Sequence, residues 1–220
     1  MSEAVKDVLR VICESLQIPT IVILILLMAV SVVMLGGIAA EFFTDHRKLK
    51  TSIPELIDTL QGKDSEEMEK AIRSAQILRR QKSALIYLIK RTSYPDNTRE
   101  ALARQLIADE EARYRKITKI TDIVARVAPM FGLMGTLIPL GPGLIALGQG
   151  DTKTLSDSLL IAFDTTVAGL VTGAISYVIS GIRKGWYERY MVALETLMET
   201  VLEEQTIERG RYDSMLKEGE

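Results

Sequence analysis

The stretch Ala128-Pro-Met-Phe-Gly-Leu-Met-Gly-Thr-Leu-Ile-Pro139 decides the fold class, because it sets glycines, prolines and one hydroxyl in an apolar run. A second stretch, Thr165-Thr-Val-Ala-Gly-Leu170, again places hydroxyls and a glycine inside a hydrophobic segment. Lipid cannot hydrogen-bond a hydroxyl, so such groups face other helices or a hydrated path. The two stretches therefore predict a membrane assembly that conducts or senses something.

Three windows of the 220-residue chain carry almost no charge, although 25% of all its residues are charged. They are residues 18–40, 123–147 and 155–182, and each exceeds the roughly 20 residues that cross a bilayer core. A very apolar soluble core is the less favoured alternative, since the first window is uncharged over 23 residues. That window is also too long for the apolar region of a secretory signal peptide. The predicted fold is an all-α membrane protein with three transmembrane helices and long cytoplasmic helical extensions.

The basic residues that flank these windows predict the orientation of the chain. Most of them lie on one side of the membrane, namely Arg47, Lys48, Lys50, Arg113, Arg115, Lys116, Lys119, Arg126, Arg183, Lys184 and Arg189. The positive-inside rule places that side in the cytoplasm, so the N-terminus is outside and the C-terminus is cytoplasmic. The predicted segments are an extracytoplasmic 1–17, transmembrane 18–40, a cytoplasmic helical loop 41–122, transmembrane 123–147, a short extracytoplasmic loop 148–157, transmembrane 158–182 and a cytoplasmic tail 183–220.

The cytoplasmic segments are predicted to be helical. A short helix begins near Pro54 and stops before Gly62, and a second helix covers residues 65–91. A third helix starts near Asn97 and continues into the membrane, since no proline or glycine follows until Pro129. The apolar stripes of residues 98–122 and 185–207 are more than one chain is expected to cover, which predicts a bundle formed by oligomerisation. A compact cytoplasmic helical domain within one chain is the alternative.

Small and hydroxyl side chains are the first candidates for a functional site. Four glycines are expected to let helices approach closely: Gly132, Gly135, Gly169 and Gly173. At 1.5 Å per residue, Thr136 lies about 20 Å and Thr166 about 24 Å from the inner ends of their spans. The two hydroxyls are therefore predicted to lie at a similar depth on antiparallel neighbours. Either ordinary interhelical hydrogen bonding or the lining of a pore would explain them.

Asp164 is the other candidate, because a carboxylate inside a span is costly when it faces lipid. It could handle a proton or another ion, or it could lie in a solvated outer vestibule. Thr165 completes the set of candidate ion-pathway residues. With one cysteine, one histidine and no phosphate-binding loop, the sequence offers no enzymatic constellation, metal site or cofactor site. A formal net charge of −2 does not suggest a nucleic-acid partner.

The motif Gly132-Leu-Met-Gly-Thr136, together with a threonine three residues before Gly169-Leu170, resembles the MotA/TolQ/ExbB proton-channel family, and the three-span layout resembles its ExbB/TolQ branch. The resemblance implies a homopentamer around a pore lined by Thr136 and Thr166. It also implies a single-span partner similar to ExbD, TolR or MotB, whose aspartate carries the proton. Such a complex is an ion-driven stator of the inner (cytoplasmic) membrane that energises an envelope or transport process.

Two features depart from the family pattern. The sequence Pro139-Leu-Gly-Pro-Gly143 replaces a more regular helix after the Gly-Thr motif, and Asp164 stands where a small or apolar residue is expected. Two other functions therefore stay open. The chain could be a structural membrane scaffold whose polar groups only pack helices, or a self-contained ion channel that uses Asp164.

Overall fold

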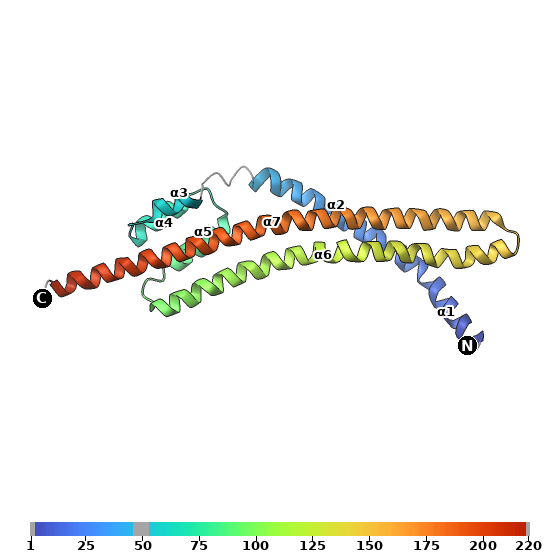
Figure 1. The fold of residues 1–220 in the computed structure, drawn as a ribbon, viewed down its shortest axis with the longest axis horizontal. Helices are drawn as coiled ribbons and strands as arrows, with labels where there is room; N and C mark the ends of the chain where they lie inside the picture. Colours follow the sequence, from blue (N-terminus) through green and yellow to red (C-terminus); the bar gives the residue numbers. More distant parts are fainter. Residues whose placement is uncertain (1–2, 46–52, 219–220) are drawn as a thin grey trace. The chain divides into compact units, whose positions relative to one another are not determined.

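The structure of the chain is a computed structural model that describes residues 3–45 and 53–218. Every regular element in these residues is an α-helix (Figure 1), which confirms the predicted all-helical class. The helices are α1 (Glu3–Ser15), α2 (Gln17–Asp45), α3 (Ile53–Leu60), α4 (Ser65–Ser74), α5 (Arg79–Ile89), α6 (Asp96–Gly148) and α7 (Thr152–Glu218). Three helical stretches are long and apolar enough to cross a membrane: Val8–Glu41, Asp96–Gly148 and Thr152–Tyr212. The predicted basic flank at Arg47, Lys48 and Lys50 lies outside the described residues.

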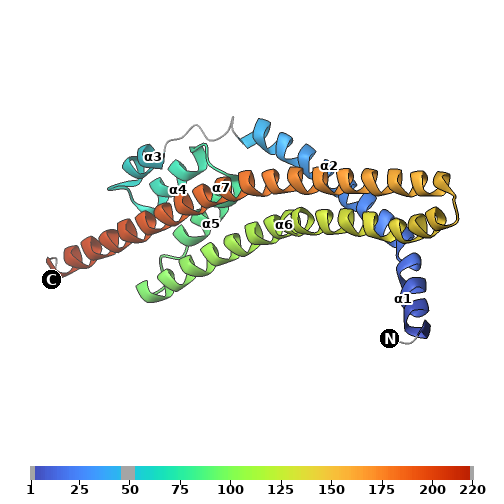
Figure 2. The same cartoon turned by 45° about the vertical axis from the view of Figure 1, so that its right-hand side comes forward.

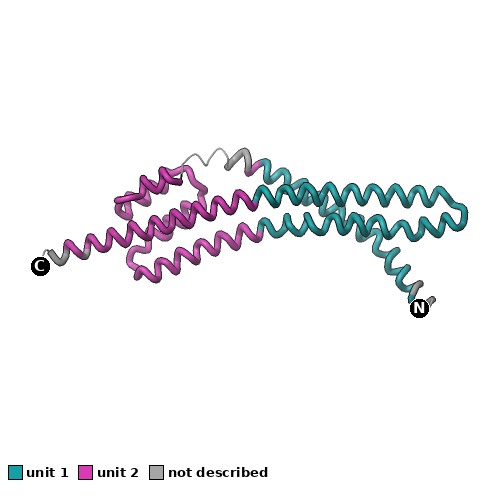
Figure 3. Tube along the Cα trace, in the orientation of Figure 1, with its two compact units in different colours: residues 1–39, 117–183 teal, residues 40–116, 184–220 magenta. Residues whose placement is uncertain are grey.

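The chain divides into two compact units, shown in Figure 3. Unit 1 comprises residues 1–39 and 117–183, and unit 2 comprises residues 40–116 and 184–220. Each of the two longest helices, α6 and α7, contributes one part to each unit. The predicted segment boundaries near residues 40, 122 and 183 are close to these limits. Their assignment to the two sides of the membrane stays a prediction.

In unit 1, α6 and α7 lie side by side and antiparallel, as both Figure 1 and Figure 2 show. They are joined by residues 149–151 alone, a shorter connection than the predicted loop 148–157. Gly150 turns the chain with φ +81°, a conformation that glycine adopts at little cost. Asp151 accepts a hydrogen bond from the backbone N–H of Thr154 (3.1 Å) and so caps the start of α7. Hydrogen bonds from the hydroxyl and backbone of Thr154 hold the pKa of Asp151 below its ordinary value.

The third membrane helix of unit 1, α2, buries one narrow face. Its buried residues are Thr20, Leu24, Ser31 and Ile38, which are spaced four or seven residues apart and therefore share a side of the helix. Val32 and Val33 are 62% and 74% exposed, as expected of a face that meets lipid.

Unit 2 contains most of the segments that the sequence predicts to be cytoplasmic, and here one sequence prediction is wrong. Residues 65–91 form two helices, because the backbone leaves the helical region at Ala75 (ψ 148°) and Leu78 (ψ 137°). Met68 and Ile72 of α4 can then pack in the same core as Leu85 and Leu88 of α5. All four of these side chains are 0% exposed.

The expectation that one chain cannot cover the apolar stripe in the C-terminal part of α7 is also wrong. Leu194, Leu197, Met198 and Val201 are at most 1% exposed within a single chain. They belong to one apolar core with residues of α3, α4, α5 and α6. The compact helical domain, the alternative kept open above, is therefore the arrangement that unit 2 adopts. A case for oligomerisation must come from the membrane part of the chain.

Candidate functional site

The contact between α6 and α7 in unit 1 is a seam of small residues. A Cβ atom placed on Gly169 would lie 2.7 Å from the Cα of Gly132 and 2.8 Å from the carbonyl oxygen of Ala128. One placed on Gly173 would lie 2.6 Å from the Cγ of Pro129. These separations are shorter than any carbon contact allows, so the two backbones touch where glycine is present.

The same seam positions the threonines. A Cβ atom on Gly135 would lie 2.6 Å from the Cβ of Thr165, so these two residues lie at one level. Thr136 and Thr166, their immediate neighbours in sequence, are therefore also at one level. Thr165 is only 8% exposed, and its hydroxyl donates to the carbonyl oxygens of Ile161 (2.9 Å) and Ala162 (3.0 Å).

The Thr136 and Thr166 side chains are both half-buried. The Thr136 hydroxyl donates to the Leu133 carbonyl at 2.6 Å, and the Thr166 hydroxyl donates to the Ala162 carbonyl at 3.1 Å. Each hydroxyl is thus satisfied by its own helix, while its oxygen can still accept a further hydrogen bond. A pair held in this way can offer polar atoms to water without an unpaired donor in the membrane.

The structure does not bring Asp164 together with this pair. Asp164 is exposed, and it precedes Thr166 by two residues, which turns it by about 200° around α7. It also lies about 140° from Gly169, which marks the side that meets α6. The carboxylate therefore points away from both the seam and the threonines.

Several buried polar side chains of unit 1 escaped the sequence reasoning. Ser176 lies beside Ser31 of α2, with the two hydroxyl oxygens 3.2 Å apart, and Ser180 donates to the carboxylate of Asp122. Arg183 is 7% exposed, and one of its guanidinium nitrogens lies 3.3 Å from a Cβ placed on Gly37. Spacing could have indicated part of this set, because Thr172, Ser176 and Ser180 recur every four residues and share a face.

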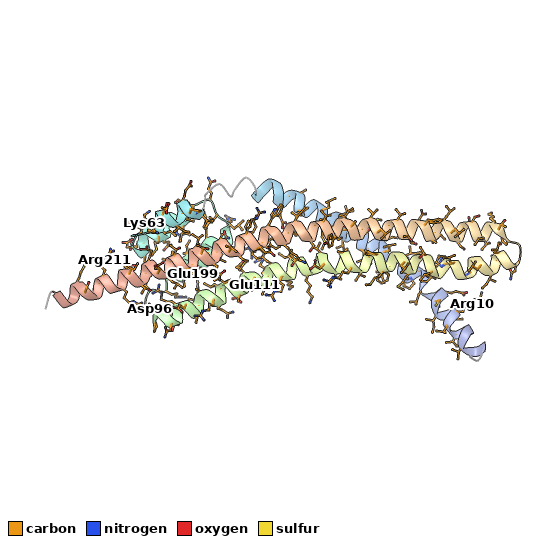
Figure 4. The ribbon with its side chains drawn as sticks, in the orientation of Figure 1. Arg10, Lys63, Asp96, Glu111, Glu199 and Arg211 are labelled. Atoms are coloured by element: carbon orange, nitrogen blue, oxygen red, sulfur yellow. The ribbon has the colours of Figure 1, made fainter. Side chains whose placement is uncertain are left out.

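A group of polar side chains links three helices of unit 2 beside its apolar core. The Arg99 side chain is 1% exposed and donates to Asp96 (3.1 Å) and to Gln205. Gln205 in turn donates to the Ile89 carbonyl at 3.0 Å, so the group joins α5, α6 and α7. Burial lowers the pKa of Arg99, although Asp96 acts in the opposite direction. Asp96, at the start of α6, and Glu199 on α7 (Figure 4) both line an adjacent cavity of about 640 Å³.

Tyr114 of α6 stacks on Tyr187 of α7, with ring centroids 4.4 Å apart. Burial, reinforced by the charge of Glu110, raises the pKa of Tyr114 to about 12. The neutral phenol is therefore favoured in the folded state relative to the unfolded chain, where a tyrosine titrates near 10.

This shift predicts a pH dependence of stability. A raised folded-state pKa contributes stability that is complete below about pH 10 and is lost as the pH rises toward about 12. Tyr114→Phe keeps the ring and removes the titration, so its stability should fall less steeply in that window, by up to about 1.4 kcal/mol per pH unit. Thermal unfolding of both proteins between pH 9 and about pH 12 would measure the difference. Parallel curves would contradict the prediction.

Comparison with known proteins identifies the family of the chain. The model of the MotA/TolQ/ExbB proton channel family matches residues 44–196, more than half of the chain, and the match includes the glycine seam and both threonines. No curated protein gives a significant match. The family consists of membrane channels that work with a partner protein, which agrees with three helices able to span a bilayer. The chain belongs to the MotA/TolQ/ExbB proton channel family.

Proposed function

We propose that the chain is the pore-forming subunit of a stator complex in the inner membrane, driven by a proton or other ion gradient. Five copies surround a pore that holds a single-span partner similar to ExbD, TolR or MotB, and the complex energises an envelope or transport process. The observation that carries this proposal is the pair Thr136 and Thr166, held at one level by the Gly135–Thr165 contact. The chain supplies the wall of an ion path, and we assign it no catalytic centre and no cofactor.

The position of α2 indicates which side of α7 faces the pore. Ser176 and Arg183 mark the side of α7 that meets α2, through Ser31 and Gly37. Thr166 lies about a quarter turn from Ser176 around α7, beyond the glycines that meet α6, and is therefore outside the face that contacts α2. In the proposed assembly α2 lies toward lipid, which leaves the side of α7 that carries Thr166 to face the pore.

Exposed apolar residues support the presence of neighbouring subunits. On the far side of α6 from the seam, Met130 and Leu137 are each 63% exposed, and on the far side of α7, Leu160 and Val167 are 61% and 60% exposed. Packing α7 of one subunit on α6 of the next would close a ring in which every contact is of the same kind.

A partner protein is proposed because the pore wall, in the part of the chain that the structure describes, has no carboxylate that faces the two threonines. Hydroxyls can relay a proton with water, yet they cannot hold one near neutral pH as a carboxylate can. Asp164, the carboxylate nearest in sequence to the threonines, lies on another face of α7. A carboxylate that faces the threonines must then come from a second protein.

Native mass spectrometry of the complex, captured from its native membranes by a C-terminal tag, tests the assembly. We expect five copies of the 24.5 kDa chain together with one or two copies of a smaller single-span protein. A monomer or dimer under mild detergent conditions would overturn the pentamer.

Proton uptake by liposomes that contain this chain alone separates the rival functions. A wall without its partner should leak little. Uptake by the chain alone that Asp164→Asn stops would establish the self-contained channel instead. A pentamer that shows no proton uptake with its native partner would favour the scaffold.

A further inference from the structure

We propose that Asp122 and Ser180 form a second polar station on the ion path, at its cytoplasmic mouth, where the Asp122 carboxylate receives the proton and passes it to cytoplasmic water. The inference rests on the pore proposed above. It assigns a role to a carboxylate that the motifs of the sequence do not include.

The register of α6 against α7 carries the inference. Asp122 precedes Thr136 by fourteen residues, and Ser180 follows Thr166 by the same fourteen. Fourteen residues are close to four helical turns, about 21 Å, so each residue returns to nearly the same face of its helix. The hydrogen bond from Ser180 to Asp122 shows that the antiparallel register is kept over this length. The second pair therefore repeats the threonine pair four turns farther in.

The surroundings of Asp122 indicate what the carboxylate would do. Lys119 and Arg126 lie three and four residues away on the same side of α6, and on α7 Arg183 follows Ser180 by three residues. Positive charges at the end of a narrow path raise the energy of a proton that is about to leave it. A carboxylate at that point offsets the charge and provides a group on which the proton can rest.

The Asp122 side chain is placed where it can take up a proton from the path. Asp122 is half-buried, so it is reachable from one side, and the Ser180 hydroxyl fixes its orientation. Its neighbour Thr121 differs in both respects. Thr121 is 0% exposed, and its hydroxyl has no hydrogen-bond partner among the described residues.

The test is proton flux through the complex captured from its native membranes and placed in liposomes, read by a pH-sensitive dye. Asp122→Asn should lower the flux by about tenfold, the effect of removing one charge roughly 10 Å from the passing proton. With the pH difference across the membrane held constant, wild-type flux should also decline as both compartments are acidified into the range where a carboxylate protonates. Asp122→Asn should lose that dependence, which a merely structural role would not alter. Ser180→Ala should lower the flux by about two- to threefold, since the carboxylate remains but is less well oriented.

Thr121→Val is the matched control, because it alters the adjacent residue on a face sealed within one chain, and it should leave flux and pH profile unchanged. If Asp122→Asn does not assemble, the pH profile of Asp122→Glu decides: a displaced profile supports the station, and a superimposable one overturns it. Wild-type flux and pH profile in Asp122→Asn also overturn it. The proposed pore fails separately, through undiminished flux in Thr136→Val.

Discussion

Thr136→Val is expected to reduce partner-dependent proton flux by about 10- to 100-fold while the complex still assembles. Valine has nearly the shape of threonine, so the seam at Gly135 and Thr165 should be kept. What is lost is a hydroxyl oxygen able to accept a hydrogen bond from water, worth about 1–3 kcal/mol where no other partner is available. A methyl group in its place also favours drying of a narrow path. Thr166→Val, at the same level on the other helix, should act in the same way.

The measurement is proton uptake into liposomes that carry the complex from its native membranes, with assembly checked by native mass spectrometry. Thr172→Val is a suitable control on α7, because Thr172 is 1% exposed and its hydroxyl has no partner among the described residues. Loss of flux in Thr172→Val as well as in Thr166→Val would point to a general defect of α7. Wild-type flux in Thr136→Val and in Thr166→Val would reject the threonines as pathway residues.

Gly169→Ala should destabilise unit 1 strongly, because the alanine adds a methyl group where the two helices touch. The added Cβ meets the backbone at Gly132 (2.7 Å) and Ala128 (2.8 Å), and backbone atoms cannot move without separating the two helices. Overpacking of this kind costs about 1–3 kcal/mol, occasionally more. Because the same contact sets the level of the threonines, flux should fall together with stability.

Gly181→Ala supplies the comparison, since it lies on the same helix and a Cβ there has nothing within 4 Å. Replacing this glycine should be neutral or should stabilise the helix by up to about 1 kcal/mol. Thermal unfolding of the detergent-solubilised proteins, followed by the fluorescence of the single tryptophan, measures both. Equal unfolding temperatures for the two variants would show that the seam tolerates a wider separation.

Much of the membrane part of the fold could be predicted from sequence. A bilayer imposes a minimum apolar length, so the windows at 18–40, 123–147 and 155–182 were enough to predict three spans. The short connection between the last two required an antiparallel pair, and glycine content predicted close approach. The residue pairs in contact, such as Gly132 with Gly169, were not predicted, because register depends on both helices together.

The fold of unit 2 was less predictable for a physical reason. The break at residues 75–78 contains neither proline nor glycine, and local preference alone would continue the helix. The chain turns there because Met68 and Ile72 gain burial against Leu85, a gain that exists once the core has formed. The same core covers Leu194 and its neighbours on α7, which made the predicted need for other chains at that stripe wrong.

The sequence by itself thus determined which segments can enter a membrane and which polar residues they carry with them, since transfer into lipid depends on composition and length. The tertiary structure alone decided which of those polar residues meet. Ser180 and Asp122 are 58 positions apart, and only the antiparallel packing of α6 on α7 joins them. Asp164 stands two residues from Thr166, yet the turn of the helix separates them. Proximity in a helical pair depends on rotation and register, which arise when both surfaces pack.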